Sequence, residues 1–338
     1  MATSVQKHFE LTSESKVDSF GGTLFRVKLT IDCKWGKAGD LGGWVQKDEN
    51  IQGFAWVSDN AQISGDAQIS GDAQISGNAQ VSGDAQISDN ALVSGNSQVY
   101  GDAQISGNAW VYGNAQISGD AQVSGNSQIS GDAQISDNAL VSGNSQISDN
   151  AQVYGDAWVY GNALVYGNAQ ISDNARVYGN ARVYGNAQIS GDAQVSGNAQ
   201  VSGDAQISDN ALVSGNSQVY GDAQISGNAW VYGNAQISGD AQVSGNSQIS
   251  GDAQISDNAL VSGNSQISDN AQVYGDAWVY GNALVYGNAQ ISDNARVYGN
   301  ARVYGDAWGT SPLQIQGSRH TLTECKKGFL QIGCKCYT

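Results

Sequence analysis

The sequence predicts an all-β fold, a single-stranded left-handed β-helix in which three hexapeptides form each 18-residue coil. Three observations predict it: an uninterrupted six-residue repeat, alternation of small or branched with polar side chains, and unusual residues recurring 18 positions apart. The 338 residues include 44 Gly but only 1 Pro, 5 Phe and 1 Met. That composition does not suit an ordinary globular core and fits a periodic one.

The repeat runs without insertion over residues 55–306, as 42 hexapeptides. Position 1 is Ala or Ser and position 3 is Val or Ile, whereas positions 2 and 4 are mostly polar or aromatic. This period of two is typical of a strand, so positions 1 and 3 should face inward. Position 5 is Gly or Asp and position 6 is Asn or Asp. These residues tolerate a positive φ angle, so each hexapeptide should end in a corner.

The spacing of unusual side chains sets the length of one coil. Four Trp residues each follow a Leu by 18 positions, in the pairs Leu92 and Trp110, Leu140 and Trp158, Leu212 and Trp230, and Leu260 and Trp278. Residues one coil apart are stacked, so unusual side chains should occur in pairs at the length of one coil. A spacing of 12 residues does not produce these pairs. Three hexapeptides per coil make about 14 coils. We also expect the frequent Gln at position 2 to form amide ladders along the axis.

Three regions follow from the limits of the repeat: an N-terminal β cap at 1–54, the solenoid at 55–306 and a C-terminal cap at 307–338. In the first cap, alternation over 8–11 and 23–31 predicts two strands around Gly21. Residues 313–315 and 329–332 also resemble strands. Caps are expected because an open solenoid end exposes strand edges.

A long duplication lies within the solenoid. Residues 76–185 recur unchanged as 196–305, a shift of 120 residues. Because 120 is not a multiple of 18, the second copy should present its side chains on another face. Whether this duplication is natural or engineered stays open.

Both ends of the chain carry distinctive segments. The first is Lys37-Ala-Gly-Asp-Leu-Gly-Gly-Trp-Val45, followed by Asn50-Ile51 and Ala55-Trp-Val-Ser-Asp-Asn-Ala61; the last runs over 312–323 and 332–334. These segments resemble phage- and prophage-encoded hexapeptide-repeat left-handed β-helix proteins of unknown function, which are YdcK-like. The resemblance implies the fold and a phage connection, and it implies no activity.

Charge and hydropathy exclude several partners. The formal charge of −16 argues against nucleic acid and anionic membranes, which require clustered Lys and Arg. No apolar run is long enough to span a membrane, and residues 1–14 lack the apolar stretch of a secretory signal. We therefore expect a location in host cytoplasm or in a virion.

The repeat contains no candidate catalytic residues. Hexapeptide acyltransferases use a His, but residues 55–306 contain no His, Lys, Cys or Glu, so we expect no catalytic residue and no enzymatic activity. His8 and His320 should be ordinary surface residues of the caps.

No metal or cofactor site is expected in the repeat either. Turn preference explains the corner Asp residues, so no metal or cofactor site is predicted. Cys33 lies in the other cap from Cys325, Cys334 and Cys336, so no disulfide can join it to them. The three C-terminal cysteines could form one disulfide or a thiolate metal site, but buried thiols are expected. The repeat has no Thr, which disfavours ice binding.

The remaining prediction is a non-enzymatic rigid rod, a structural spacer or binding module of the phage type that presents aromatic, Gln, Ser and Asn ladders. Outward aromatic and Arg side chains form the candidate surface for a glycan or protein partner. Its members are Trp110, Tyr112, Trp158, Tyr160, Arg176, Tyr178, Trp230, Tyr232, Trp278, Tyr280, Arg296 and Tyr298. The alternatives are a carbohydrate- or receptor-binding fibre module, a self-assembling filament, a relic acyltransferase scaffold, and aromatics that only cover the solenoid flank. Homo-oligomers and end-to-end assembly stay open.

Overall fold

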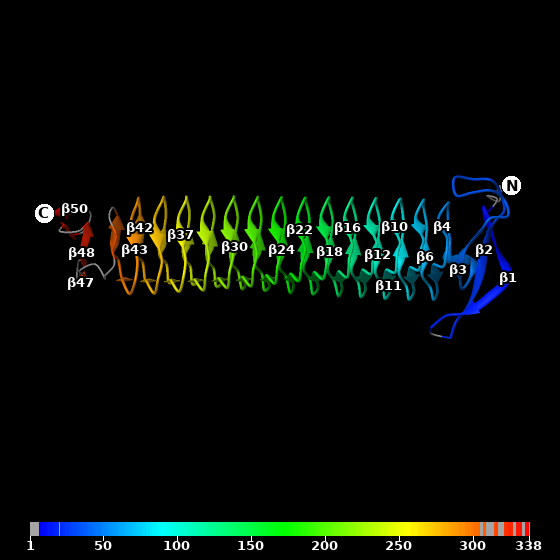
Figure 1. Ribbon diagram of the computed structural model, residues 1–338, viewed down its shortest axis with the longest axis horizontal. Coiled ribbons are helices and arrows are strands. Elements are labelled where there is room, and N and C mark those ends of the chain that lie inside the picture. The colour runs from blue at the N-terminus through cyan, green and yellow to red at the C-terminus, as the bar shows by residue number, and fades with distance from the viewer. Residues whose placement is uncertain are drawn as a thin grey trace, which may run out of the picture. The chain divides into compact units, whose positions relative to one another are not determined.

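The computed structural model describes residues 7–19, 21–304, 307–308, 314–316, 321–326, 329–332 and 335–337. The chain divides into two compact units, an N-terminal unit of residues 1–167 and a C-terminal unit of residues 168–338. Both are built from β-strands, some of which are labelled in Figure 1.

The N-terminal unit begins with a small β cap. Strands β1 (Phe9–Val17) and β2 (Thr23–Leu29) are antiparallel, which confirms the two strands expected around Gly21. Strand β3 (Leu41–Val45) pairs antiparallel with β2 and parallel with β5 (Gln62–Ile63), so β3 joins the cap to the first coil. The short 3-10 helix η1 (Asp48–Asn50) follows it.

Two glycines let β3 close the end of the apolar core. A Cβ atom at Gly42 would lie 2.4 Å from the carbonyl oxygen of Val57, and one at Gly43 would lie 2.7 Å from Cγ1 of the same residue. Because no real Cβ tolerates such contacts, only glycine allows the backbone this close to the first coil.

The coils of the N-terminal unit form three parallel sheets, in which each strand pairs with the strand three places along. The first sheet contains β4 (Trp56–Val57), β7 (Gln74–Ile75), β10 (Leu92–Val93), β13 (Trp110–Val111), β16 (Gln128–Ile129), β19 (Gln146–Ile147) and β22 (Leu164–Val165). The second contains β5, β8 (Gln80–Val81), β11 (Gln98–Val99), β14 (Gln116–Ile117), β17 (Gln134–Ile135) and β20 (Gln152–Val153). The third contains β6 (Gln68–Ile69), β9 (Gln86–Ile87), β12 (Gln104–Ile105), β15 (Gln122–Val123), β18 (Leu140–Val141) and β21 (Trp158–Val159).

The C-terminal unit repeats this arrangement. One sheet contains β23 (Gln170–Ile171), β26 (Gln188–Ile189), β29 (Gln206–Ile207), β32 (Gln224–Ile225), β35 (Gln242–Val243), β38 (Leu260–Val261), β41 (Trp278–Val279) and β44 (Arg296–Val297). Another contains β24 (Arg176–Val177), β27 (Gln194–Val195), β30 (Leu212–Val213), β33 (Trp230–Val231), β36 (Gln248–Ile249), β39 (Gln266–Ile267), β42 (Leu284–Tyr286) and β45 (Arg302–Tyr304). The third contains β25 (Arg182–Val183), β28 (Gln200–Val201), β31 (Gln218–Val219), β34 (Gln236–Ile237), β37 (Gln254–Ile255), β40 (Gln272–Val273), β43 (Gln290–Ile291) and β46 (Ala307–Trp308).

A separate antiparallel sheet follows these coils. Its strands lie in chain order, β47 (Gln314–Gln316), β48 (Thr321–Lys326), β49 (Phe329–Ile332) and β50 (Lys335–Tyr337). Its position confirms the strands expected near 313–315 and 329–332. The side chains of Cys325 and Cys336, and residues His320 and Cys334, lie outside what the structure describes.

The strand register confirms the 18-residue coil. All four predicted Leu and Trp pairs are Cα partners in parallel ladders, at Leu92 and Trp110, Leu140 and Trp158, Leu212 and Trp230, and Leu260 and Trp278. The left-handed winding stays a prediction.

The core is confirmed at positions 1 and 3, where the Ala, Val and Ile side chains over 61–303 are essentially inaccessible to solvent. Ser replaces Ala at six position-1 sites, and each buried hydroxyl donates to the carbonyl three residues earlier, as from Ser97 to Ser94 at 2.8 Å. The hydrogen bond offsets the cost of burying a hydroxyl.

The corners depend on position 5 alone. Positive φ angles occur at its Gly and Asp residues, such as Gly107 (69°) and Asp89 (60°), whereas no position-6 Asn or Asp of the described coils has one. An Asp here also bonds to the next coil, since Asp89 accepts the Gly107 N–H at 2.9 Å. The carboxylate thereby offsets the unfavourable left-handed backbone conformation.

Amide ladders run through Asn at position 6, not through Gln at position 2 as expected. Asn108 donates to Asn126 at 2.9 Å and Asn126 donates to Asn144 at 2.9 Å, each one coil further on. In the C-terminal unit Asn228, Asn246 and Asn264 repeat the pattern. The short Asn side chains sit at the corners, so they meet at the spacing of one coil.

Candidate functional site

The candidate partner-binding residues are outward-facing. Six are large side chains with 37% to 50% of their surface exposed, namely Trp110, Tyr112, Trp158, Trp230, Tyr232 and Trp278. Arg176 and Arg296 are also exposed, and Tyr160, Tyr178, Tyr280 and Tyr298 are half-buried. Within the C-terminal unit these side chains do not share one face, because Trp230 and Trp278 lie in different sheets.

The best-defined part of this set lies in a groove of the C-terminal unit with a cavity volume of about 410 Å³. One wall consists of position-2 side chains from successive coils of one sheet: Gln242, Leu260, Trp278 and Arg296. The other wall consists of position-6 corner residues: Asn258, Asp276 and Asn294. Because both walls repeat every coil, the groove runs along the solenoid axis.

Contacts between adjacent coils order this groove. The guanidinium carbon of Arg296 lies 4.7 Å from the ring centroid of Trp278, a cation–π contact. On the other wall Asn258 Nδ2 donates to Asp276 Oδ1 at 3.0 Å. The groove therefore offers an indole, a guanidinium, amides and one carboxylate on a fixed spacing.

Two tyrosines, Tyr280 and Tyr298, stack on each other beside the groove. The rings of Tyr280 and Tyr298 have centroids 5.4 Å apart and planes 14° apart. They lie two positions beyond Trp278 and Arg296 in the same two coils. The 18-residue period thus brings all four side chains onto one face.

The remaining candidates have simpler surroundings. Trp110 and Trp230 lie between a Leu on the preceding coil and a Gln on the following coil. Trp158 pairs with Leu140 in the N-terminal unit, and Tyr178 in the C-terminal unit donates its hydroxyl to Gln194 Oε1 at 3.2 Å. None of these lines the groove.

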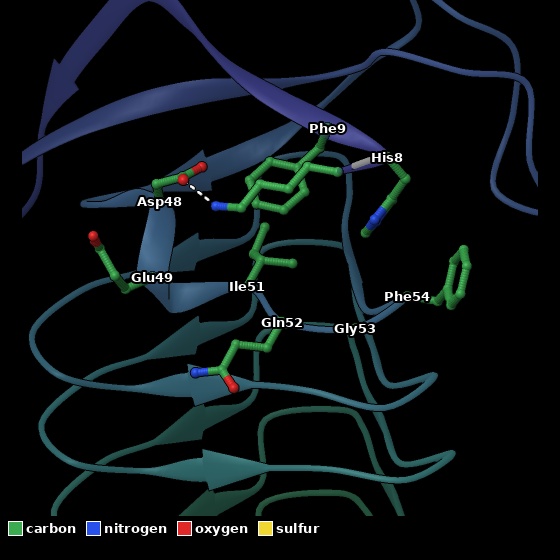
Figure 2. Close-up of a pocket in the computed structure, with 9 residues that line it drawn as sticks. His8, Phe9, Asp48, Glu49, Ile51, Gln52, Gly53 and Phe54 are labelled. Carbon is green, nitrogen blue, oxygen red and sulfur yellow. Dashed lines mark hydrogen bonds and ion pairs between the residues drawn. The ribbon is translucent and has the colours of Figure 1, made fainter. Parts of the chain in front are cut away.

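A second cavity of about 410 Å³ lies in the N-terminal cap, where residues 7–9 face residues 48–54 (Figure 2). Apolar walls come from Phe9, Ile51 and Phe54, and the polar rim includes Lys7, His8, Asp48, Glu49 and Gln52. Lys7 pairs with Asp48, and its ammonium group lies 5.3 Å from the Phe9 ring centroid.

His8 beside this cavity is not the surface residue that we expected. Its side chain is only 2% exposed, and its Nε2 lies 2.9 Å from the Ala55 carbonyl oxygen. Burial lowers the pKa of His8 below its ordinary value of 6.5, the Ala55 hydrogen bond opposes the shift, and Lys34 adds to it. The sequence carried no signal for this burial, because strand alternation places His8 on the face opposite Phe9 and Leu11.

The corner wall of the groove was also missed. Asn258 and Asp276 occupy turn positions and were interpreted only as corner residues. Because position 6 immediately precedes the next strand, the 18-residue period already placed them beside Leu260 and Trp278.

Within the part of the chain that the structure describes, no three His, Cys, Asp or Glu side chains are grouped to hold a metal ion. Among the same residues, no helix is long and apolar enough to cross a membrane.

Comparison with known families agrees with the repeat. The family described as YdcK Beta solenoid repeat matches overlapping segments from residue 67 to residue 308. The chain belongs to this YdcK β-solenoid repeat family. The matched residues include every coil that forms the groove, so the groove is built on the family's repeat. A comparison with curated proteins finds no match.

Proposed function

We propose that this chain is a non-enzymatic, rigid β-solenoid scaffold of the phage or prophage type whose groove in the C-terminal unit binds a linear neutral glycan. Parallel ladders and a fully buried Val, Ile and Ala core support the scaffold role, because each coil is hydrogen-bonded to its neighbours. Host cytoplasm or a virion is the proposed location.

One observation carries the binding role: Trp278 is 42% exposed in a groove where half of the other lining side chains are amides. An indole beside hydrogen-bonding side chains suits a sugar ring, which has apolar and hydroxylated sides. The acidic chain repels polyanions, so a neutral polymer fits better than an acidic one. A groove parallel to the axis suits a linear ligand.

Binding should be measured on a glycan array and then by calorimetry with the best neutral oligosaccharide. Trp278→Gln, which installs the commonest residue at position 2, should remain folded and lose binding. Trp230→Gln is the matched control, because Trp230 is 50% exposed in the same unit and lies outside the groove.

Retained binding in Trp278→Gln would show that the aromatics only cover the solenoid flank. Equal loss in Trp230→Gln would place the ligand elsewhere on the C-terminal unit.

A further inference from the structure

The N-terminal edge of the first coil is a strand edge that the cap closes with side chains. Within the coils, a position-2 N–H donates to the position-1 carbonyl of the next coil, as from Gln62 to Ala79 at 2.9 Å. Strand β4 is the first strand of its sheet, so no coil supplies a donor to the Ala55 carbonyl. His8 Nε2 occupies that place at 2.9 Å.

Other cap side chains act similarly at neighbouring carbonyls. Asn50 Nδ2 donates to Ala67 at 2.8 Å and to Gly65 at 3.2 Å. Trp35 Nε1 donates to the Phe54 carbonyl at 2.6 Å. Of these three donors, only the imidazole of His8 can titrate between pH 5 and 8.

The hydrogen bond defines the state of the imidazole. A carbonyl oxygen can only accept, so Nε2 carries the hydrogen and Nδ1 is the atom that gains a proton in acid. The ring is buried among aromatic side chains, with centroids 5.3 Å from Phe9, 5.8 Å from Phe54 and 6.3 Å from Trp56. Protonation would place a charge inside this cluster.

The charged groups around His8 do not favour that charge. Lys7 precedes it in the chain, and Lys34 lowers its pKa. The facing helix η1 carries Asp48 and Glu49, but Asp48 is paired with Lys7. Lys34 in turn pairs with Asp72 of the coils at 2.6 Å.

We propose that His8 is an acid-operated latch, whose neutral ring holds the cap on the first coil and whose protonation releases the cap from the edge of β4. The coils at 55–306 contain no His, so they lack a group that titrates with the His8 ring. Acid therefore separates the cap from coils that stay folded. The latch is independent of the proposed glycan binding.

The lowered pKa of His8 sets the pH range in which the cap should open. The pKa of His8 is lower in the closed cap than the ordinary value of 6.5, so closure is fully stabilised above pH 6.5. The stabilisation declines as the pH falls from 6.5 towards the pKa of His8 in the closed cap, and it is constant below that. Because at most one proton is taken up, the opening equilibrium should rise by up to about tenfold per pH unit inside this window.

Hydrogen–deuterium exchange of the full chain tests the latch, with rates corrected for the intrinsic pH dependence of exchange. As the cap opens, the backbone amides of Trp44 and Gln46, which donate to the Ala61 and Ile63 carbonyls, should lose protection with this pH dependence. The amides of β4, β10 and β13 donate to the following coil, so they should stay protected. NMR of the His8 ring fixes the lower end of the window.

Two variants distinguish the latch from general acid opening. His8→Gln keeps an N–H donor for the Ala55 carbonyl and cannot titrate, so its cap should stay protected throughout the window. His8→Phe keeps an apolar ring without the donor, so its cap should exchange faster at every pH.

Acid opening of His8→Gln in the same window would overturn the proposal in favour of carboxylate titration. The unmodified protein gives a second test. The proposal would also be overturned if the corrected protection of its cap amides did not change between pH 6.5 and the pKa of His8.

Discussion

Arg296 lies over the indole ring of Trp278 from the adjacent coil, with its guanidinium carbon 4.7 Å from the ring centroid. Both residues occupy position 2 of their hexapeptides and are Cα partners in the parallel ladder. The coil period alone therefore creates the contact, which forms one wall of the groove.

This contact should contribute modestly to stability. A double-mutant cycle of Trp278→Gln and Arg296→Gln should give a coupling of about 0.5 to 1 kcal/mol, the range for an exposed cation–π pair. Urea unfolding followed by circular dichroism supplies the four free energies. A coupling of zero would mean that the two side chains do not interact in solution. Trp230→Gln combined with Arg296→Gln is the additive control.

The orientation of strand positions gives a second prediction. Val159 is fully buried at position 3, so Val159→Asp should bury an unpaired carboxylate and cost several kcal/mol. Ser142, at position 4 of the preceding coil, points outward, so Ser142→Asp should change the free energy of unfolding by less than about 1 kcal/mol. Similar losses in both variants would contradict the inward and outward assignment.

The corner Asp residues predict a third result. Asp89→Ala keeps the left-handed φ of 60° but loses the acceptor for Gly107, so it should cost about 1 to 2 kcal/mol. Asp89→Gly loses the same hydrogen bond and relieves the backbone strain, so it should be the more stable variant. Comparison of their chemical unfolding midpoints checks the order; a less stable Gly variant would show that strain is unimportant there.

Stacked carboxylates predict a pH dependence. Neighbouring coils displace part of the water around the exposed carboxylate of Asp102 and so raise its pKa, and Asp120 and Asp84 on the adjacent coils raise it further. The folded chain thus binds this proton more tightly than the unfolded chain. The stabilisation is complete below the unfolded pKa and disappears as the pH rises through the folded value.

Asp102→Asn should therefore raise the melting temperature at pH 7. On acidification, the melting temperature of this variant should rise less than that of the unmodified protein. Asp132→Asn is the control, because Asp132 accepts a hydrogen bond from Asn114 at 2.8 Å instead of meeting a second carboxylate. Equal shifts in both variants would assign the effect to net charge alone.

Local alternation made most of the fold predictable. Position 3 is Val or Ile in every hexapeptide, so the inward face was unambiguous, and the pairs such as Leu140 and Trp158 set the coil at 18 residues. Neither inference required a distant contact, because every coil repeats the same local geometry.

Only one wall of the groove could be predicted from the sequence. The period placed Leu260, Trp278 and Arg296 in a column, since they share position 2. The opposite wall of Asn258 and Asp276 followed the same period, but a turn residue gives no sign of which way its side chain points.

The sequence by itself determined the repeat, the coil length and the core, because these depend on contacts that recur every 18 residues. Only the tertiary structure decided how the non-repeating cap meets the first coil. His8 is buried there because the Ala55 carbonyl lacks a preceding coil and because Phe9, Phe54 and Trp56 surround its ring. That hydrogen bond joins residues 47 positions apart without a repeating pattern, so no local periodicity could specify it.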